Sequence, residues 1–435
     1  MWYSRFLRAL ALLVTAGAAA QAQDDAQLVA KAHAIHTKAI KIDTHVDINP
    51  AQMIGPAPNY VTGIERNKVD LPKMEKDGLD AVFFSIYVGQ RQDFSDSAYA
   101  RANAAYTEKF DAVHTLAEKM APDRIEIAYT AADVRRIHKA GKKVALMGVE
   151  NAWGMGQDIT AVKTFYDRGA RYVALTHDGH NQLSDSNTGD TDNVWKWNGL
   201  SPLGRQVVEE ANRYGIMMDI SHPSRQSNLQ VMALSKAPVI ASHSGVRALA
   251  NHRRNLDDEQ LLALKQNGGV VQLVALSSFV KVPAPDSPER AAAIAELRAR
   301  SGFGGGQGGG QGGARRAAGA AGGSPSDSAF AAYRTKLAEI DARFPPSPRA
   351  TVKDFANHID YAVKLIGVEH VGIASDFDGG GGVDGYNDAS ESFNVTLELV
   401  RRGYSEKDIV AMWGGNLLRV MEQVEKVARG IQAKK

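Results

Sequence analysis

The chain has 435 residues and a formal net charge of +2, so its composition gives no reason to expect a nucleic-acid or anionic membrane surface as its main partner. It contains no cysteine, which excludes disulfides, cysteine-ligated zinc and a lipid anchor on cysteine. The length fits one barrel of roughly 250 to 400 residues better than three small domains.

The first 22 residues are expected to be a signal peptide outside the fold. Arg5 and Arg8 give a positive start, residues 9–20 are apolar but too short to span a bilayer, and residues 20–22 form a small-x-small cleavage pattern. The alternative is an uncleaved N-terminal anchor. The barrel domain would then occupy residues 23–435, exported to the periplasm or secreted, and its basic C-terminus predicts no GPI tail.

Eight continuous apolar segments are predicted to be strands that are buried on both faces. Helical patterns such as Pro202–Tyr214 and Asp257–Gln266 lie between most of them, and this alternation predicts a parallel sheet. We expect an α/β fold closed into a TIM-like (β/α)8 barrel. An open doubly wound sheet is the alternative, but it gives no reason to gather polar residues from non-adjacent strands at one rim. The expected strands are Lys41–Asp47, Asp80–Val88, Lys143–Glu150, Arg171–His177, Ile216–His222, Pro238–Ser244, Gly269–Leu276 and His370–Asp376.

A low-complexity insertion at residues 282–348 interrupts this order after the seventh predicted strand. Its Gly-rich middle cannot bury enough apolar surface to order itself, so we expect that part to be disordered. Helical patterns flank it at Pro288–Arg300 and Ser328–Arg343, and the barrel pattern resumes at Thr351. We interpret the insertion as a tolerated loop; the alternative is a segment that covers the rim.

A histidine and an aspartate end the first predicted strand, and a glutamate ends the third. Strand alternation would point His45 and Asp47 to the same side, although a lone pair of this kind is weak evidence and a solvated turn pair is the alternative. Glu150 follows an apolar run, where an unpaired carboxylate would be very costly. Its two oxygens could bridge two cations; pairing with a nearby Arg or Lys is the alternative.

Two further histidines follow apolar strands, in the sequences DISH and ASHS. His222 and His243 each have the imidazole that suits zinc and similar metals, but either alone is more often a structural histidine. Together with the three residues above, and with Glu150 shared, they would give each of two metals three protein ligands and an open position. That is the pattern of a catalytic rather than a structural metal site.

An aspartate in GIASDFDG ends the last predicted strand. Asp376 is our candidate general acid–base, because it could take a proton from water and pass it to a leaving group. Asp378 lies close enough in sequence to be confused with it. The alternative for both is a capping pair at a glycine-rich turn.

The loops after the fourth and sixth predicted strands carry candidates for substrate contact. His177, in LTHDGH, could stabilise an oxyanion, whereas His180 is interpreted as a loop residue. Arg253 or Arg254, in NHRRN, could hold a substrate carboxylate by a bidentate contact. An exposed basic loop is the alternative for the two arginines.

Taken together, these segments resemble the membrane dipeptidase (renal dipeptidase) family of zinc peptidases. The resemblance runs through nearly the whole mature chain and rests on KIDTHVD, DLPKMEKDGLDAVFFSIYV, GVENAWGMG, RYVALTHDGHN, MMDISH, ASHSGVRALANHRRN and GIASDFDG. It implies a TIM-like barrel of the metallo-dependent hydrolase type with a binuclear zinc site that hydrolyses dipeptides. It also implies a homodimer and a tolerance for a D-residue at the C-terminal position.

The resemblance also implies how the metal ligands divide. One zinc would be held by His45, Asp47 and Glu150, and the other by Glu150, His222 and His243, so that Glu150 bridges the two. Other divalent metals remain compatible with these donors.

By the same resemblance, Asp376 matches the acid–base aspartate, His177 the substrate-contacting histidine and Arg254 the arginine that binds the substrate carboxylate. Two departures bear on substrate preference: the chain reads ALSSFVKV where the family commonly has a tyrosine, and the Gly-rich insertion is unusual.

We therefore expect an exported binuclear-zinc dipeptidase that binds small dipeptides, not nucleic acid, and has no stable membrane anchor. One alternative is another metal-dependent amidohydrolase on the same barrel, such as a lactonase, deaminase or phosphotriesterase, since fold alone does not separate these. The other alternative is a non-catalytic relative that captures peptides.

Overall fold

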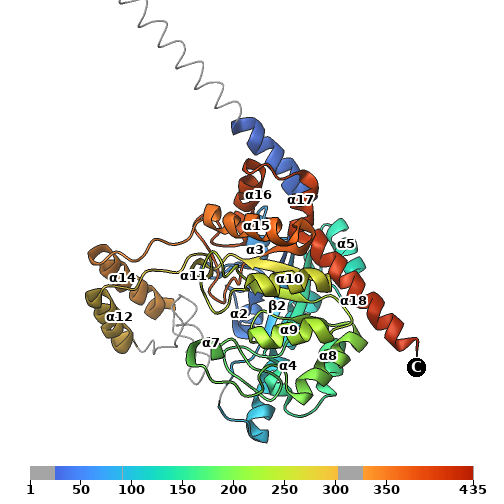
Figure 1. Ribbon diagram of the computed structural model, residues 1–435. Coiled ribbons are helices and arrows are strands. Elements are labelled where there is room, and N and C mark those ends of the chain that lie inside the picture. The colour runs from blue at the N-terminus through green and yellow to red at the C-terminus, as the bar shows by residue number, and fades with distance from the viewer. Residues whose placement is uncertain (1–24, 91, 302–326, 435) are drawn as a thin grey trace, which may run out of the picture.

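The computed structural model describes residues 25–90, 92–301 and 327–434, which form a barrel of parallel strands surrounded by helices (Figure 1). The main path of the sheet holds eight strands, and each neighbouring pair is parallel. The predicted TIM-like (β/α)8 fold is therefore confirmed. In their order around the sheet, the strands are β1 (Ile42–Asp47), β2 (Ala81–Tyr87), β4 (Lys143–Glu150), β5 (Ala170–Ala174), β6 (Met217–Asp219), β7 (Ile240–Ser244), β8 (Val270–Val274) and β9 (Val371–Ala374).

The residues that follow β9 bring the last strand against the first and nearly close the barrel. The main-chain N–H of Asp47 donates a hydrogen bond to the Phe377 carbonyl at 2.9 Å. Asp43 reinforces this seam, because its Oδ1 accepts the main-chain N–H groups of His45 and Ser375 at 3.1 and 3.2 Å. The side chains at the carboxyl ends of β1 and β9 consequently lie on the same rim.

One short strand, β3 (Ile125–Ile127), was not predicted from the sequence. It lies off the main path and pairs in parallel with β4. Its three residues are too few to establish a periodicity, so only the tertiary structure identifies it.

The helices begin and end where local chemistry dictates. Pro202–Tyr214 is a helix with the predicted bounds, α8: Ser201 caps its start by accepting the N–H of Gly204, and Gly215 ends it in the left-handed conformation at φ 89°. The other helices, short 3₁₀ and π segments included, are α2 (Pro50–Ile54), α3 (Leu71–Glu75), α4 (Asp96–Thr115), η1 (Leu116–Met120), α5 (Ala131–Lys139), η2 (Ala152–Met155), α6 (Ala161–Asp167), α7 (Gly189–Asp192), α9 (Arg225–Leu234), α10 (Asp258–Asn267), α11 (Ser277–Val280), α12 (Pro288–Ser301), α14 (Asp327–Arg343), α15 (Val352–Ile366), η3 (Val368–His370), η4 (Ala389–Glu391), α16 (Ser392–Arg401), α17 (Glu406–Val410), η5 (Ala411–Gly415) and α18 (Asn416–Gln432), preceded by a helix at residues 25–38.

The insertion contains the two predicted flanking helices, α12 and α14, which lie side by side at the edge of the molecule (Figure 1). Arg290 of α12 holds the pair together, since its Nη1 donates to Asp341 Oδ1 of α14 at 2.6 Å. The Gly-rich middle of the predicted insertion, residues 302–323, lies outside the described residues, as does the predicted signal peptide at residues 1–22. Among the helices that are described, none is long and apolar enough to cross a bilayer.

Candidate metal centre

The predicted site residues meet at the carboxyl rim of the barrel, but three of them lie beyond the strands rather than at their ends. His45 and Asp47 belong to β1, Glu150 ends β4 and His243 belongs to β7. The strands predicted to end at His177, His222 and Asp376 stop instead at Ala174, Asp219 and Ala374. The backbone leaves the sheet early at these three places, so the side chains reach the site from loops.

Glu150 is the common neighbour of the predicted ligands. Its Oε1 lies 2.9 Å from His222 Nε2 and 3.8 Å from His243 Nε2, and its Oε2 lies 3.5 Å from His45 Nε2. Each of these side chains is at most 3% exposed. The carboxylate therefore faces imidazoles from β1, from β7 and from the loop after β6, as a bridging ligand would.

A second grouping contains two carboxylates. Single ligand atoms of His45, Asp47 and Asp376 all lie within 4.8 Å of one another. The turn after β9 makes this approach possible: Asp376 adopts a φ of 57°, and a Cβ on Gly379 would lie 2.2 Å from Asp376 Oδ1 and 2.5 Å from Asp47 Oδ2. Only glycine at position 379 lets the main chain pass so close to both carboxylates.

The structure gives different surroundings to Asp376, our candidate acid–base, and to Asp378, the neighbour that could be confused with it. The carboxylate of Asp378 accepts the main-chain N–H groups of Lys68 and Val69 at 3.0 and 3.2 Å, so it serves the local fold. Asp376 is 4% exposed and lies with the candidate ligands. Asp378 thus ties the turn after β9 to the segment at Lys68 and Val69.

His177 lies closer to the candidate ligands than an oxyanion contact alone requires. Its Nε2 is 3.7 Å from Glu150 Oε1, and single ligand atoms of Glu150, His177 and His222 lie within 4.8 Å of one another. The geometry therefore allows His177 to contact either a cation or a substrate oxygen. His180 is directed elsewhere, because its Nδ1 accepts the N–H of Ser186 at 3.1 Å.

The donor set fits divalent cations of the zinc class. It consists of imidazole nitrogens and carboxylate oxygens, which are ligands for such metals in catalytic sites. His222 Nε2 and His243 Nε2 face each other at 3.0 Å, a separation that needs either a proton or a cation between two lone pairs. His45 Nε2 and His222 Nδ1 are buried without a hydrogen-bond partner. A buried polar nitrogen is energetically costly unless it binds another group, such as a cation.

The electrostatics of the cluster favour positive charge at its centre. Burial acts to lower the pKa of His45, but the carboxylates of Glu150 and Asp376 outweigh it and raise that pKa to about 9. Burial acts to raise the pKa of Glu150, yet the imidazoles, His45 first, hold it well below its usual range. Burial and nearby cationic groups lower the pKa of His243, which stays neutral. The same carboxylates that favour a proton on His45 would also attract a divalent cation.

Of the two candidate arginines, Arg254 faces the site. It is 4% exposed, its Nη2 donates to the His243 carbonyl at 3.2 Å, and its Nη1 is buried without a hydrogen-bond partner. Burial lowers its pKa to about 10, so it remains a cation at neutral pH. Arg253 instead donates to Asp178 Oδ2 at 3.3 Å and ties two rim loops together. A buried guanidinium with a spare donor suits a carboxylate ligand.

Two residues around the ligands were not predicted. The Tyr172 hydroxyl lies 2.9 Å from His45 Nδ1, and the Ser85 hydroxyl donates to Glu150 Oε2 at 3.1 Å. Gly148 makes room for the tyrosine, because a Cβ there would lie 2.0 Å from the Tyr172 ring. A polar residue inside an apolar strand, as in VFFSIYV, is the signal that could have revealed Ser85.

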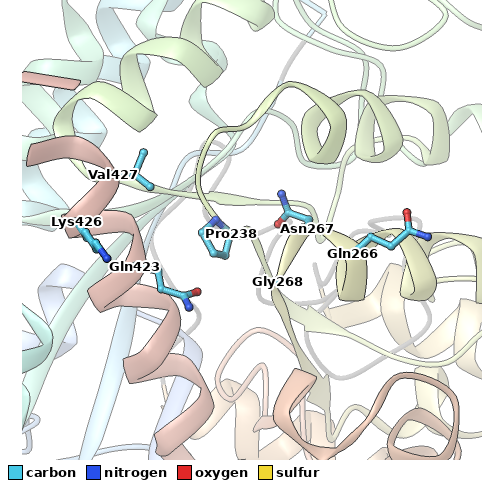
Figure 2. Close-up of a pocket in the computed structure, with 7 residues that line it drawn as sticks. All are labelled: Pro238, Gln266, Asn267, Gly268, Gln423, Lys426 and Val427. Atoms are coloured by element: carbon cyan, nitrogen blue, oxygen red, sulfur yellow. The ribbon is translucent and has the colours of Figure 1, made fainter. Parts of the chain in front are cut away.

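A hollow of about 520 Å³ lies elsewhere on the barrel (Figure 2). Pro238 and Gly268, which line it, precede β7 and β8, so it opens at the amino ends of the strands, opposite the rim that carries His243. Among its lining residues only Lys426 is charged, and no candidate ligand contributes to it. This hollow is therefore separate from the cluster of candidate ligands at the carboxyl rim.

Comparison with known proteins identifies the family. A model described as membrane dipeptidase (peptidase family M19) matches residues 29–435. The chain belongs to this family. The resemblance noted from the sequence is confirmed, and as a family member the chain is a metallodipeptidase, a hydrolase that acts on dipeptides.

Individual relatives and a solved structure support the same family assignment. The chain is 30% identical over 364 residues to dipeptidase tcpJ of Claviceps purpurea (strain 20.1), covering 83% of this chain and 70% of that protein. It is 30% identical over 399 residues to dipeptidase verJ of Clonostachys rogersoniana, covering 89% and 84%. Among solved structures, the probable dipeptidase PvdM from Pseudomonas aeruginosa superposes with a TM-score of 0.73 at 31% identity, covering 92% of this chain and 99% of that one.

A more distant solved structure agrees in fold. The metallo peptidase from Rhodobacter sphaeroides, solved with a phosphinate mimic of the dipeptide L-Ala-D-Ala, superposes with a TM-score of 0.65 at 22% identity, covering 89% of this chain and 99% of that one. At this identity the likeness supports the barrel architecture alone.

Proposed function

We propose that this chain is an exported dipeptidase with two zinc ions held at the carboxyl rim of its barrel. The observation that carries the proposal is the convergence of His45, His222 and His243 on Glu150, with the buried cation of Arg254 bonded to the same β7 rim. A cationic anchor beside a metal centre suits a short peptide with a free carboxylate.

In this proposal Glu150 would be shared as a ligand by the two ions. His45 and Asp47 would complete the ligands of one ion, and His222 and His243 those of the other. When bound, the ions supply Lewis-acid activation of water and of the scissile carbonyl. Other divalent metals that bind imidazole and carboxylate ligands are compatible with the same donors.

The proposed roles of the remaining residues follow from where they lie. Asp376 accepts a proton from the attacking water as the new C–O bond forms, and it delivers that proton to the amine nitrogen as the C–N bond breaks. His177 steadies the oxyanion of the tetrahedral intermediate. Arg254 holds the free carboxylate of the dipeptide and so fixes the distance from the peptide end to the scissile bond.

The substrate range includes dipeptides with a C-terminal D-residue. This point rests on the family resemblance, and a structural neighbour from Rhodobacter sphaeroides, 22% identical, was solved with a phosphinate mimic of L-Ala-D-Ala. When its carboxylate is bound by Arg254, a C-terminal D-residue directs its side chain differently from an L-residue. Whether both are accepted therefore depends on the space beside Arg254.

Export and dimer formation complete the proposal. Residues 1–22 have the charge, the apolar run and the small-x-small motif of a cleaved signal peptide, and the cleaved chain would be periplasmic or secreted without a membrane anchor. The homodimer rests on the family resemblance. Mass analysis of exported protein and sedimentation of the purified chain test these two points.

The central test combines turnover with metal analysis on one sample. Purified protein should hydrolyse Ala-L-Ala or Ala-D-Ala, contain about two equivalents of metal, lose activity on chelation and recover it with Zn²⁺. An N-acetylated and C-amidated dipeptide serves as the matched control, since it lacks both free termini. Hydrolysis that resists complete chelation would contradict the metal centre. Efficient hydrolysis of lactones or phosphotriesters without dipeptide turnover would favour the alternative amidohydrolase function.

A further inference from the structure

A buried carboxylate lies behind the candidate metal centre, on the strand beside the one that carries His243. Asp219 is the last residue of β6 and is 1% exposed. Its Oδ1 accepts the main-chain N–H groups of Ser221 and Ser242 at 3.1 and 2.8 Å. Its Oδ2 accepts the hydroxyl of Ser242 at 2.6 Å. Three donors thus converge on its two oxygens, as they do on a carboxylate that only accepts.

The hydroxyl of Ser242 has one proton and more than one neighbour that could accept it. Asp219 Oδ2 lies at 2.6 Å, whereas Ser221 Oγ lies at 3.3 Å. A bond to a carboxylate is charge-assisted and therefore shorter and stronger than a bond to a neutral hydroxyl. The Ser242 proton is consequently committed to Asp219.

This commitment determines which ring nitrogen of His243 carries a proton. His243 Nδ1 lies 2.7 Å from Ser242 Oγ, and the two atoms must share one hydrogen at that distance. Because the hydroxyl proton points to Asp219, Nδ1 supplies the hydrogen and the oxygen accepts it. The lone pair of the ring then resides on Nε2, the atom that faces Glu150 and His222.

We propose that Asp219 and Ser242 are positioning residues that hold His243 in the tautomer required of a metal ligand. They form a three-membered chain from carboxylate through hydroxyl to imidazole, with no part in the first coordination sphere. The inference deepens the proposed function and rests on it, since it assumes that His243 binds a cation.

Replacement of Asp219 by asparagine provides a sharp test, because the volume stays nearly the same. The amide oxygen can still accept the two main-chain N–H groups, but the amide nitrogen would face Ser242 as a donor. The hydroxyl would then turn its proton toward His243 Nδ1 and move the ring proton to Nε2, where it would compete with a bound metal.

The experiment measures Zn²⁺ affinity by competition of metal-free full-length protein with a chromophoric chelator. Asp219→Asn and Ser242→Ala are each expected to weaken binding of one of the two ions by about 10- to 100-fold, which is typical for partners of a ligating histidine. Ser244→Ala is the matched control: this serine is also fully buried on β7, but its hydroxyl contacts Ser221 Oγ at 3.3 Å. Its affinity should stay within about twofold of the wild type.

Two further readouts separate positioning from general damage. Thermal unfolding of the metal-free proteins should give similar midpoints for Asp219→Asn and the wild type. Nitrogen NMR of histidine-labelled, metal-free protein should place the His243 proton on Nδ1 in the wild type and on Nε2 in Asp219→Asn. An unchanged tautomer or an affinity within about twofold of the wild type for both variants would overturn the inference. A wild-type protein that takes up no Zn²⁺ would overturn the proposed function itself, and this inference with it.

Discussion

Arg254 and His243 are joined by a hydrogen bond from the guanidinium Nη2 to the main-chain carbonyl, 3.2 Å long. The bond ties the candidate carboxylate anchor to the backbone of a candidate metal ligand. It leaves Nη1 as a buried donor without a hydrogen-bond partner. If Arg254 binds the free carboxylate as proposed, this bond to β7 would set the distance from the end of a bound peptide to the candidate ligands and would favour peptides of two residues.

Substitution of Arg254 should therefore impair binding of the free carboxylate. Arg254→Lys keeps the charge but loses the planar fork, and we expect kcat/KM for dipeptides to fall by about 10- to 100-fold, mainly through KM. The measurement is steady-state kinetics with a dipeptide and its C-terminal amide. Arg253→Ala, which removes the neighbouring arginine that pairs with Asp178, is the control. An equal loss for the dipeptide and its amide would show that Arg254 does not bind the carboxylate.

Asp376→Asn should affect turnover rather than metal binding. The amide cannot accept a proton from water, so kcat is expected to fall by about 10²- to 10⁴-fold while the metal content stays at the wild-type level. Asp378→Asn is the matched control from the same turn, and its effect should be on stability, because its carboxylate accepts main-chain N–H groups. Comparable kcat values for Asp376→Asn and the wild type would remove Asp376 from the chemistry.

Much of the fold could be predicted because buried parallel strands produce continuous apolar runs that alternate with amphipathic helices. The helix Pro202–Tyr214 has the predicted bounds because serine, proline and glycine mark its ends. Strand ends were less predictable. An apolar residue such as Leu175 or Ile220 is equally buried in a strand or in the loop after it, so the pattern does not show where sheet pairing stops.

The candidate ligands could be predicted because each is a polar residue after an apolar run. Tyr172 could not, because its ring is apolar enough to pass for core while its hydroxyl lies against His45. The choice of Asp376 over Asp378 rested on the family resemblance, because the pattern alone barely separates the two. Only the fold shows that Lys68 and Val69 donate to one of the two carboxylates.

Removal of the Gly-rich part of the insertion should leave the chemistry intact. Residues 302–323 make up most of the connection between α12 and α14, and Arg290 Nη1 of α12 already lies 2.6 Å from Asp341 Oδ1 of α14. A shortened connection changes closure entropy only slightly, so we expect kcat/KM to stay within about twofold of the wild type after deletion of Gly302–Gly323. Dipeptide kinetics of the deletion variant measure this. A large loss in kcat/KM would assign the segment a role at the rim.

The last prediction concerns stability against acid and depends on His36, far from the metal centre. His36 is 1% exposed on the N-terminal helix, with Nδ1 2.7 Å from Thr396 Oγ1. Burial, followed by the charge of Lys41, lowers its pKa to about 4.

In the unfolded chain His36 has a pKa of about 6.5 and becomes protonated below that pH. In the folded chain it becomes protonated only near pH 4. The contribution of His36 to stability is thus fully present above about pH 6.5 and is lost as the pH falls toward 4.

At about pH 5 the wild type should have lost about 2 kcal/mol through this residue alone. His36→Gln cannot titrate, so the difference in unfolding free energy between it and the wild type should shrink by that amount from about pH 7.5 to about pH 5. Denaturant unfolding at both pH values measures the difference. His33→Gln, one turn earlier and stacked on Phe393 at 3.9 Å between ring centroids, is the control. A difference for His36→Gln that does not change with pH would show that the pKa of His36 is the same in the folded and the unfolded protein.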